Sequence, residues 1–396
     1  MNKQIQELAE NLFPQLQEMR RHLHAHPELS FEEQATAAYV ADQLQAIGIT
    51  AISTGVAGTG VVALIKGNNP DKKCVALRAD MDALPITEAN ETSYCSQNPG
   101  VMHACGHDVH TTCLLGAARI LHQLRDSFEG TVKLIFQPGE EKSPGGASLM
   151  IAAGALENLR PEAIFGLHVY PQLPAGQVGF KAGKYMASAD EIYLTIHGKG
   201  GHAALPEETV DPIAISALII TALQQVVSRK AGPMRPTVLT FGKIEGGHTT
   251  NVIPETVQLA GTFRALDEAW RQEALGYIRN ITQQIAQANG ANASIEIPAG
   301  YPCLHNDIEL TRRAQSWAVD YLENKHVHEL PLRMGAEDFS FYTQKIPGCF
   351  FRIGTNTDNE KYTTPVHNAH FDIDEKALIT GTGMMALMAI QELQQV

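Results

Sequence analysis

The strongest constraint on the fold is a set of short, almost continuous apolar segments that alternate with longer segments of helical periodicity. The apolar segments are residues 60–65, 74–77, 132–136 and 163–167. Apolar residues recur at helical spacing over residues 5–21, 33–47 and 111–124. A strand without polar alternation is buried on both faces of its sheet. The pattern therefore predicts an α/β fold in which helices flank a mostly parallel sheet.

The pattern changes after about residue 183, where apolar and polar residues alternate over 192–197 as in a sheet with one face in water. Asp211 and Pro212 then provide an N-cap and a first-turn proline for a helix. The segments that follow complete the order strand, helix, strand, strand, helix, strand, which is ferredoxin-like. We therefore expect an inserted ferredoxin-like α+β domain at residues 184–298.

The last part of the chain returns to the α/β pattern. It shows helical periodicity over 308–322 and 374–393 and an apolar strand at 349–353. The first domain is therefore expected to be discontinuous, with residues 1–183 and 299–396. A chain of 396 residues is long enough for two such domains.

Composition and charge exclude several classes of partner. The net charge is −13 and no cluster of Lys and Arg stands out, so we expect no nucleic-acid partner and no anionic membrane surface. No segment approaches the ~18 consecutive apolar residues that a membrane span needs. The N-terminus is typical of an amphipathic helix rather than a signal peptide, and the six scattered cysteines favour reduced thiols. These features predict a cytoplasmic enzyme.

The densest chemical signal is the segment His-Ala-Cys-Gly-His-Asp-Val-His-Thr at residues 103–111. Cys and His both bind zinc and similar ions, and an extended segment would bring Cys105 and His107 to one side. The plain alternative is a helix N-terminus with incidental polar residues. The concentration of a thiol and several imidazoles argues against it. Because the paired Cys-x-x-Cys of a structural zinc site is missing, we expect a catalytic metal site with an open position.

Further polar residues follow the predicted strands at the edge where ligands gather in an open α/β sheet, and one lies in a turn near the C-terminus. These residues are Asp80, Asp82, Glu140, Glu141, His168 and His367. Each is weak alone, because paired glutamates are common on solvated faces and a lone histidine often has no further role. Their convergence predicts one site. Of the adjacent glutamates, one would bind metal and the other would transfer protons.

Together these motifs resemble the aminoacylase and carboxypeptidase family of dinuclear metallohydrolases. The similarity is to the amidohydrolase branch, which includes hippurate hydrolases, N-acetyl-diaminopimelate deacetylases and plant hydrolases of indole-acetyl amino acids. The similar segments occur in order along nearly the whole chain, at residues 20–28, 78–85, 103–111, 137–141, 166–168, 198–204, 251–255, 335–339 and 366–368. The resemblance implies a catalytic α/β domain with an inserted ferredoxin-like lid, in agreement with the periodicity.

The resemblance also implies the composition of the metal site. Carried over by position, the ligands of two divalent metal ions are Cys105, His107, Glu141, His168 and His367. Glu140 would be the general base. Other branches have a His-x-Asp pair where this chain has Asp80-Met81-Asp82, and a ligand Asp where it has the segment from Cys105 to His107. We therefore expect Asp80 and Asp82 to orient the site. The mixed ligand set admits zinc, manganese, cobalt or nickel.

A second group of implied residues lies on the inserted domain. His202 resembles the family histidine that reaches the active site of a neighbouring subunit and stabilises the oxyanion. This implies a homodimer formed through the lid domain, with lid closure completing the site. Asn251 and Arg264 are suited to hold a substrate carboxylate. For Arg264 the plain alternative is an ion pair on an exposed strand.

The implied activity is metal-dependent hydrolysis of the amide bond of N-acyl amino acids. A water molecule shared by the two metal ions would lose its proton to Glu140, which would later donate to the leaving nitrogen. One alternative is a carboxypeptidase or dipeptidase of the same family, which a comparison of N-acetyl amino acids with dipeptides would distinguish. Another is a noncatalytic binding protein on a decayed hydrolase scaffold. Loss of Glu140 or of several ligands would indicate the latter, and none is missing.

Overall fold

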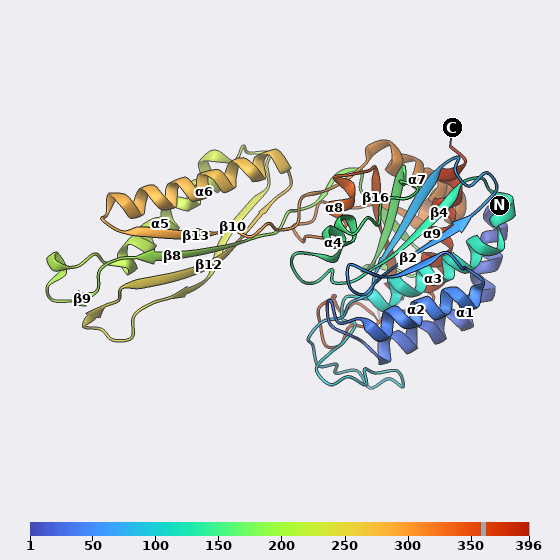
Figure 1. Ribbon diagram of the computed structural model, residues 1–396, viewed down its shortest axis with the longest axis horizontal. Helices are drawn as coiled ribbons and strands as arrows, with labels where there is room; N and C mark the ends of the chain where they lie inside the picture. Colours follow the sequence, from blue (N-terminus) through green and yellow to red (C-terminus); the bar gives the residue numbers. More distant parts are fainter. Residues whose placement is uncertain (358–361, 396) are drawn as a thin grey trace. The chain divides into compact units, whose positions relative to one another are not determined.

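The computed structural model describes residues 1–357 and 362–395, which form two compact units (Figure 1). The first comprises Met1–Gly183, His305–Pro331 and Asp338–Val396, and the second comprises Lys184–Leu304 and Leu332–Glu337. The second unit thus extends beyond residue 298 and takes in a segment that the sequence pattern assigned to the first. Backbone pairing is the reason, because the N–H of Ala187 donates to the carbonyls of Arg333 and Gly335.

An eight-stranded sheet forms the centre of the first unit, in the order β1-β2-β4-β3-β5-β16-β6-β15 (Figure 1). Its strands are β1 (Ile52–Val56), β2 (Gly60–Lys66), β3 (Cys74–Asp80), β4 (Thr131–Gln137), β5 (Ala163–Pro174), β6 (Val178–Phe180), β15 (Val327–Glu329) and β16 (Gly348–Asn356). The central neighbours β4, β3, β5 and β16 pair in parallel. Every residue of β3, β4 and β16 is buried. The predicted mostly parallel, doubly buried sheet is therefore confirmed.

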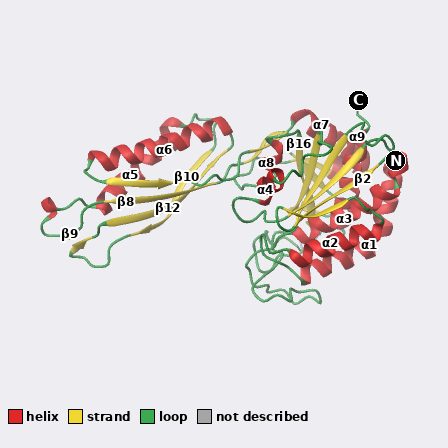
Figure 2. Ribbon diagram, viewed as in Figure 1, coloured by secondary structure: helices red, strands yellow, loops and turns green. Residues whose placement is uncertain are grey.

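Helices cover both faces of this sheet (Figure 2). On one face pack α1 (Asn2–Ala25), α2 (Gln34–Ile47), α3 (His107–Gln123), α7 (Ile308–Leu322) and α9 (Ala377–Leu393). On the other face pack the short helices α4 (Gly146–Ala152) and α8 (Ser340–Thr343). Helix α2 ends as expected at Gly48, which adopts the left-handed conformation with a φ of 97°.

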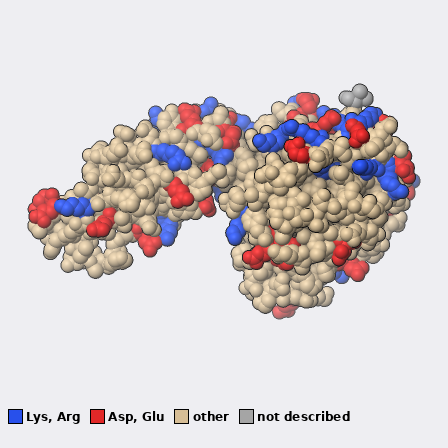
Figure 3. Space-filling model, viewed as in Figure 1, with Lys and Arg blue, Asp and Glu red and all other residues tan. Residues whose placement is uncertain are grey.

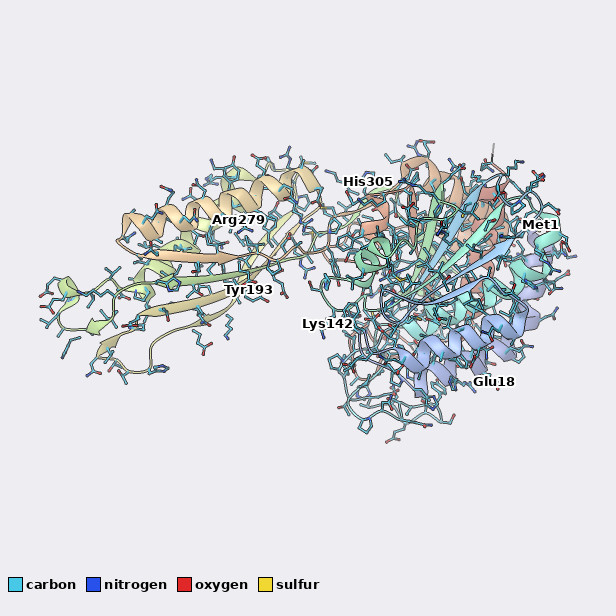
Figure 4. All side chains as sticks on the ribbon, in the orientation of Figure 1. Met1, Glu18, Lys142, Tyr193, Arg279 and His305 are labelled. Atoms are coloured by element: carbon cyan, nitrogen blue, oxygen red, sulfur yellow. The ribbon has the colours of Figure 1, made fainter. Side chains whose placement is uncertain are left out.

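The second unit contains a four-stranded antiparallel sheet in the order β10-β12-β8-β13. Its strands are β8 (Asp190–His197), β10 (Thr237–Glu245), β12 (Thr256–Ala265) and β13 (Asn292–Glu296), and the helices α5 (Pro212–Gln225) and α6 (Glu268–Ala288) pack on one face. The chain order is the expected ferredoxin-like one. Tyr193 lies on the exposed face of β8, whereas Arg279 lies on α6 (Figure 4). The Asp211 carboxylate caps α5 by accepting the N–H groups of Ile213 and Ala214.

Four short strands complete the chain. They are β7 (Gly183–Met186), β9 (Gly201–His202), β11 (Val252–Ile253) and β14 (Leu304–Asn306). Strands β9 and β11, which are separated in the sequence by α5 and β10, pair antiparallel within the second unit.

Among the described residues, one helical segment is long and apolar enough to cross a membrane by length and composition alone, Pro212–Lys230. It consists of α5 and the helical turn that follows it. On its inner side Ile215, Ile219 and Leu223 are buried in the hydrophobic core of the second unit. Basic and acidic side chains are interspersed on the face of the molecule in Figure 3, so that face is neither purely basic nor purely acidic.

Candidate active site

Cys105 and His107 lie at the N-terminal end of α3, and both are buried. The segment is not extended as expected, because Gly106 between them adopts the left-handed conformation with a φ of 79°. The carbonyl of Gly106 accepts the N–H groups of Val109 and His110, so the helix begins at His107 rather than near residue 111. This turn still brings the thiol and the imidazole into one cluster.

Two groups of ligand-type side chains converge here. Cys105, His107 and His168 form one group, and Cys105, Glu141 and His367 form the other, with the ligand atoms of each group within 4.8 Å of one another. Cys105 Sγ lies 3.4 Å from His168 Nε2, and Glu141 Oε1 lies 3.0 Å from His367 Nε2. The structure thus brings together all five side chains expected as ligands, in two sets that share one thiol.

The chemistry of this cluster suits divalent cations. His107 Nε2 is buried, and no described residue forms a hydrogen bond with it. It lies 3.9 Å from Glu141 Oε1. Burial lowers the pKa of His107, but the charges of Asp80, Asp82 and Glu141 outweigh burial and raise the pKa to about 10. The cluster therefore holds a surplus of negative charge that a cation would balance.

The protonation states of His168 and Cys105 also fit a bound cation. His168 Nδ1 donates to the carbonyl of Val169 at 2.9 Å, so the lone pair of Nε2 faces the thiol. Burial lowers the pKa of His168 and keeps the ring neutral, which is the form that binds metals. Burial, together with Glu141, raises the pKa of the Cys105 thiol. A bound cation would be needed to hold Cys105 as a thiolate.

Asp80 and Asp82 lie behind the histidines. His107 Nδ1 donates to Asp82 Oδ1 at 3.1 Å, which directs Nε2 into the cluster. Asp82 also accepts the N–H of Glu141 at 3.0 Å. Asp80 accepts from His110 Nδ1 at 2.6 Å. Both carboxylates contact groups that border the cluster, which is the position that an orienting role requires.

His110 is a residue that the sequence signals do not single out. Its Nε2 accepts the N–H of Val169 at 2.9 Å, directly after His168. Asp80, His107 and His110 lie close enough to hold an ion. However, both ring nitrogens of His110 already form hydrogen bonds, which is the arrangement of a residue that orients its neighbours. Its spacing of three residues from His107 on one helix is the signal that could have found it.

Glu140 lies beside the ligand groups and is 7% exposed. Its carboxylate clusters with His107 and Glu141, and its Oε1 accepts the N–H of Asp338 at 3.4 Å. The Asp338 carboxylate in turn accepts from the buried Arg78 at 2.7 Å. Arg78 and Asp338, which the sequence signals also leave without a role, connect β3 to the segment before α8. Lys142, which directly follows the two glutamates, is labelled in Figure 4.

His202, Asn251 and Arg264 lie in the second unit. His202 is exposed and pairs with Val252, directly after Asn251. Its Nδ1 accepts the N–H of Ala204 at 3.0 Å, so its proton is on Nε2. Arg264 lies near the far end of β12, a strand that spans roughly 30 Å at the usual rise. The structure therefore does not bring Asn251 and Arg264 together within one chain.

Comparisons with known proteins agree with this geometry. Residues 76–391 match the model of peptidase family M20/M25/M40. The N-acetyl-L-cysteine deacetylase of Bacillus subtilis is 42% identical over 365 residues, which cover 92% of this chain and 85% of the relative. The thermostable carboxypeptidase 2 of Saccharolobus solfataricus is 39% identical over 377 residues, or 94% of each chain.

A solved structure leads to the same family. The crystal structure of the Bacillus subtilis protein YxeP, a dinuclear metal-binding peptidase of family M20, matches with a TM-score of 0.83 and 35% identity, over 98% of this chain and 100% of that one. The chain therefore belongs to peptidase family M20/M25/M40, in its amidohydrolase branch, and is a metal-dependent amidohydrolase.

Proposed function

We propose that this enzyme hydrolyses the amide bond of N-acyl amino acids into a carboxylic acid and an amino acid. The observation that carries the proposal is the pair of ligand groups that share Cys105, with Glu140 beside them. Cys105, His107 and His168 would hold one divalent cation, and Cys105, Glu141 and His367 the other. When bound, two such cations would lower the pKa of a water molecule and polarise the amide carbonyl.

Glu140 performs the proton transfers. Its buried carboxylate takes the proton of the attacking water and returns it to the leaving nitrogen, so that the amine departs as a neutral group. The contact with the N–H of Asp338 holds the carboxylate in place during both transfers. Glu141 directly follows but faces His367, so the two glutamates serve different tasks.

His202 donates a hydrogen bond to the oxyanion that develops on the amide oxygen. Its Nε2–H is available because Nδ1 is occupied by the N–H of Ala204. The side chain is exposed on the β9 strand. We propose that it serves the active site of a second subunit, where a preorganised donor stabilises the transition state.

The second unit supports a homodimer. Strand β10 is one of the two edge strands of its sheet, and edge strands are templates for pairing with another chain. Ile244 on β10 is 57% exposed and lines a groove between β10 and α5, where Ile220 and Gln224 lie on the α5 side. Leu218, also on α5, is 53% exposed. A second copy, rather than a membrane, would cover this apolar face. In such a dimer Asn251 and Arg264 from different subunits could hold one substrate carboxylate.

A substrate panel tests the proposed activity. The chelated, inactive enzyme is reconstituted separately with zinc, manganese, cobalt and nickel, and kcat/KM is measured for N-acyl amino acids and for dipeptides. We expect chelation to abolish turnover and the N-acyl amino acids to give the higher kcat/KM. Higher values for dipeptides would favour the alternative, a peptidase like the relative named thermostable carboxypeptidase 2.

The role of Glu140 is tested by Glu140→Gln. The amide keeps the shape of the side chain but cannot accept the proton, so we expect the variant to retain its metal and lose kcat by at least ~100-fold. Glu157→Gln, at an exposed position, is the matched control and should keep wild-type kcat. Equal activity in Glu140→Gln would remove Glu140 from the mechanism.

A further inference from the structure

The turn that carries Glu140 and Glu141 is held by a carboxylate on each side. On one side Asp82 accepts the N–H of Glu141 at 3.0 Å. On the other side Glu33 accepts the N–H of Gly139 at 2.8 Å. Two consecutive residues with different tasks must point in different directions, so a small rotation of this backbone would displace both glutamates at once.

Glu33 is fully buried, and its carboxylate accepts three hydrogen bonds. Oε1 accepts the N–H of Phe31 at 2.9 Å in addition to that of Gly139, and Oε2 accepts the hydroxyl of Thr59 at 2.6 Å. Burial raises the pKa of Glu33. A buried carboxylate costs free energy unless donors surround it. Three donors offset this cost for Glu33, and one of them is the N–H of Gly139 in the turn, so the carboxylate and the turn backbone hold each other in place.

The backbone that Glu33 binds has an unusual conformation. Gly139 has a φ of 58°, in the left-handed region. A Cβ atom at this position would lie 2.3 Å from the ring of Phe31, two residues before Glu33. The hydroxyl of Ser30 donates to Asp82 at 2.7 Å. One short segment, residues 30–33, thus packs against the turn, supplies one of the two carboxylates that hold it and contacts the other.

We propose that Glu33 is a positioning residue for hydrolysis: it fixes the backbone at Gly139 and thereby the directions of the Glu140 and Glu141 side chains. The inference rests on the roles proposed above for these two glutamates. The alternative is that Glu33 only stabilises the fold, as a helix-capping carboxylate does.

Two substitutions separate the effect of the length of the Glu33 side chain from that of its charge. In Glu33→Gln the amide oxygen can still accept from Gly139 and Phe31, while the amide group donates to the Thr59 oxygen. In Glu33→Asp the charge remains, but the side chain is one methylene shorter. We expect Glu33→Gln to keep kcat and metal affinity within ~3-fold of wild type. Glu33→Asp should lower kcat and metal affinity by ~10-fold or more, as is usual for residues that support metal ligands, with KM little changed.

Glu28 provides a matched control in the same segment. Its carboxylate also accepts two N–H groups and one hydroxyl, but these belong to Ala35 and Thr36 at the start of α2. Glu28→Asp should lower the free energy of unfolding and leave kcat and metal affinity unchanged. Metal affinity is measured by competition with a chelating dye, and unfolding by urea.

Several results would overturn the proposal. Glu33→Asp could lose only stability, as Glu28→Asp should, or Glu33→Gln could be as impaired as Glu33→Asp. If Glu33→Asp does not fold, Thr59→Val, which removes the hydroxyl that donates to Oε2 of Glu33, takes its place. This variant is expected to lower kcat and metal affinity by ~3-fold. Unchanged values of both would refute the positioning role of Glu33. Wild type and Glu140→Gln are assayed in parallel. If wild type cleaves no N-acyl amino acid, the proposed function fails, while the metal affinities still test Glu33.

Discussion

At the scale of single residues, the partner of one ring nitrogen determines what the other nitrogen of each histidine can do. Asp82 accepts the proton of His107 Nδ1, and the carbonyl of Val169 accepts that of His168 Nδ1, so both Nε2 atoms face the cluster of ligand-type side chains. In His202 the arrangement is reversed, because Nδ1 accepts a backbone N–H and Nε2 becomes the donor. The partner therefore separates the two histidines proposed as ligands from the one proposed as a donor.

A substitution of His110 tests whether this residue orients the neighbouring His168. His110→Asn can still donate to Asp80, but it lacks the acceptor that holds the N–H of Val169 next to His168. We expect metal affinity to fall by ~10–100-fold, the usual cost of losing a group that orients a ligand. His122→Asn, at the other end of α3 and partly exposed, should bind metal like wild type. Unchanged affinity in His110→Asn, measured by chelator competition, would contradict the supporting role.

His24 gives the stability a pH dependence. Its Nδ1 lies 2.8 Å from Asp108 Oδ2, and its Nε2 lies 3.1 Å from Glu88 Oε1. Burial and then Arg20 lower the pKa of His24, but the two carboxylates outweigh them, so the pKa is raised. A raised pKa contributes stability fully below the unfolded value of ~6.5, and this contribution is lost as the pH rises through the folded value.

We therefore expect the free energy of unfolding to fall more steeply above pH ~6.5 in wild type than in His24→Gln. Urea denaturation of both proteins at a series of pH values, with metal saturating, measures the two slopes. Parallel slopes would show that the protonated ring does not stabilise the folded state.

At the scale of elements, the sequence predicts the cores of the buried strands and misses the strands at the margins. Strands β3, β4 and β16 are apolar along their length and are recognised. Strand β1, with the sequence Ile-Ser-Thr-Gly-Val, is mostly exposed and carries no such signal. Strand β5 continues past His168 to Pro174 because β16 pairs with it in parallel over that length. Partner strands, which a local pattern does not contain, decide these ends.

The N-cap of α5, in contrast, is specified by the local sequence. Asp211→Ala removes the acceptor for the N–H groups of Ile213 and Ala214 and should lower the stability of the second unit by ~1 kcal/mol. Hydrogen exchange of the first α5 amides should accelerate, while metal affinity stays at the wild-type value. Unaltered exchange at Ile213 and Ala214 would mean that the cap contributes nothing.

At the scale of the whole molecule, the residues of the proposed mechanism are divided between the two units. The ligand groups and Glu140 belong to the first unit, and His202, Asn251 and Arg264 to the second. If the homodimer forms as proposed, each complete site uses residues of two copies of the chain.

Mixing two inactive variants tests this division. A mixed dimer of Glu140→Gln and His202→Ala contains one site with Glu140 and the partner's His202 both intact. After subunit exchange at equal amounts, we expect roughly a quarter of wild-type activity, because half of the dimers are mixed and each has one intact site. Each variant alone, carried through the same exchange, is the control. No recovery, despite exchange shown by differently sized tags, would place His202 outside the partner's site.

The sequence by itself determined the α/β class, the ferredoxin-like order of the second unit and the side chains that meet at the metal cluster. The class and the strand order follow from local patterns, since burial and helix caps are properties of short segments, whereas the full set of ligands was carried over by position from the family resemblance. Only the tertiary structure decided that Cys105 belongs to both ligand groups and that Glu33 supports the turn 106 positions away at Gly139. It also placed Asn251 in the turn before β11 and Arg264 near the far end of β12. Contacts between such distant positions depend on strand register and packing, which no short segment encodes.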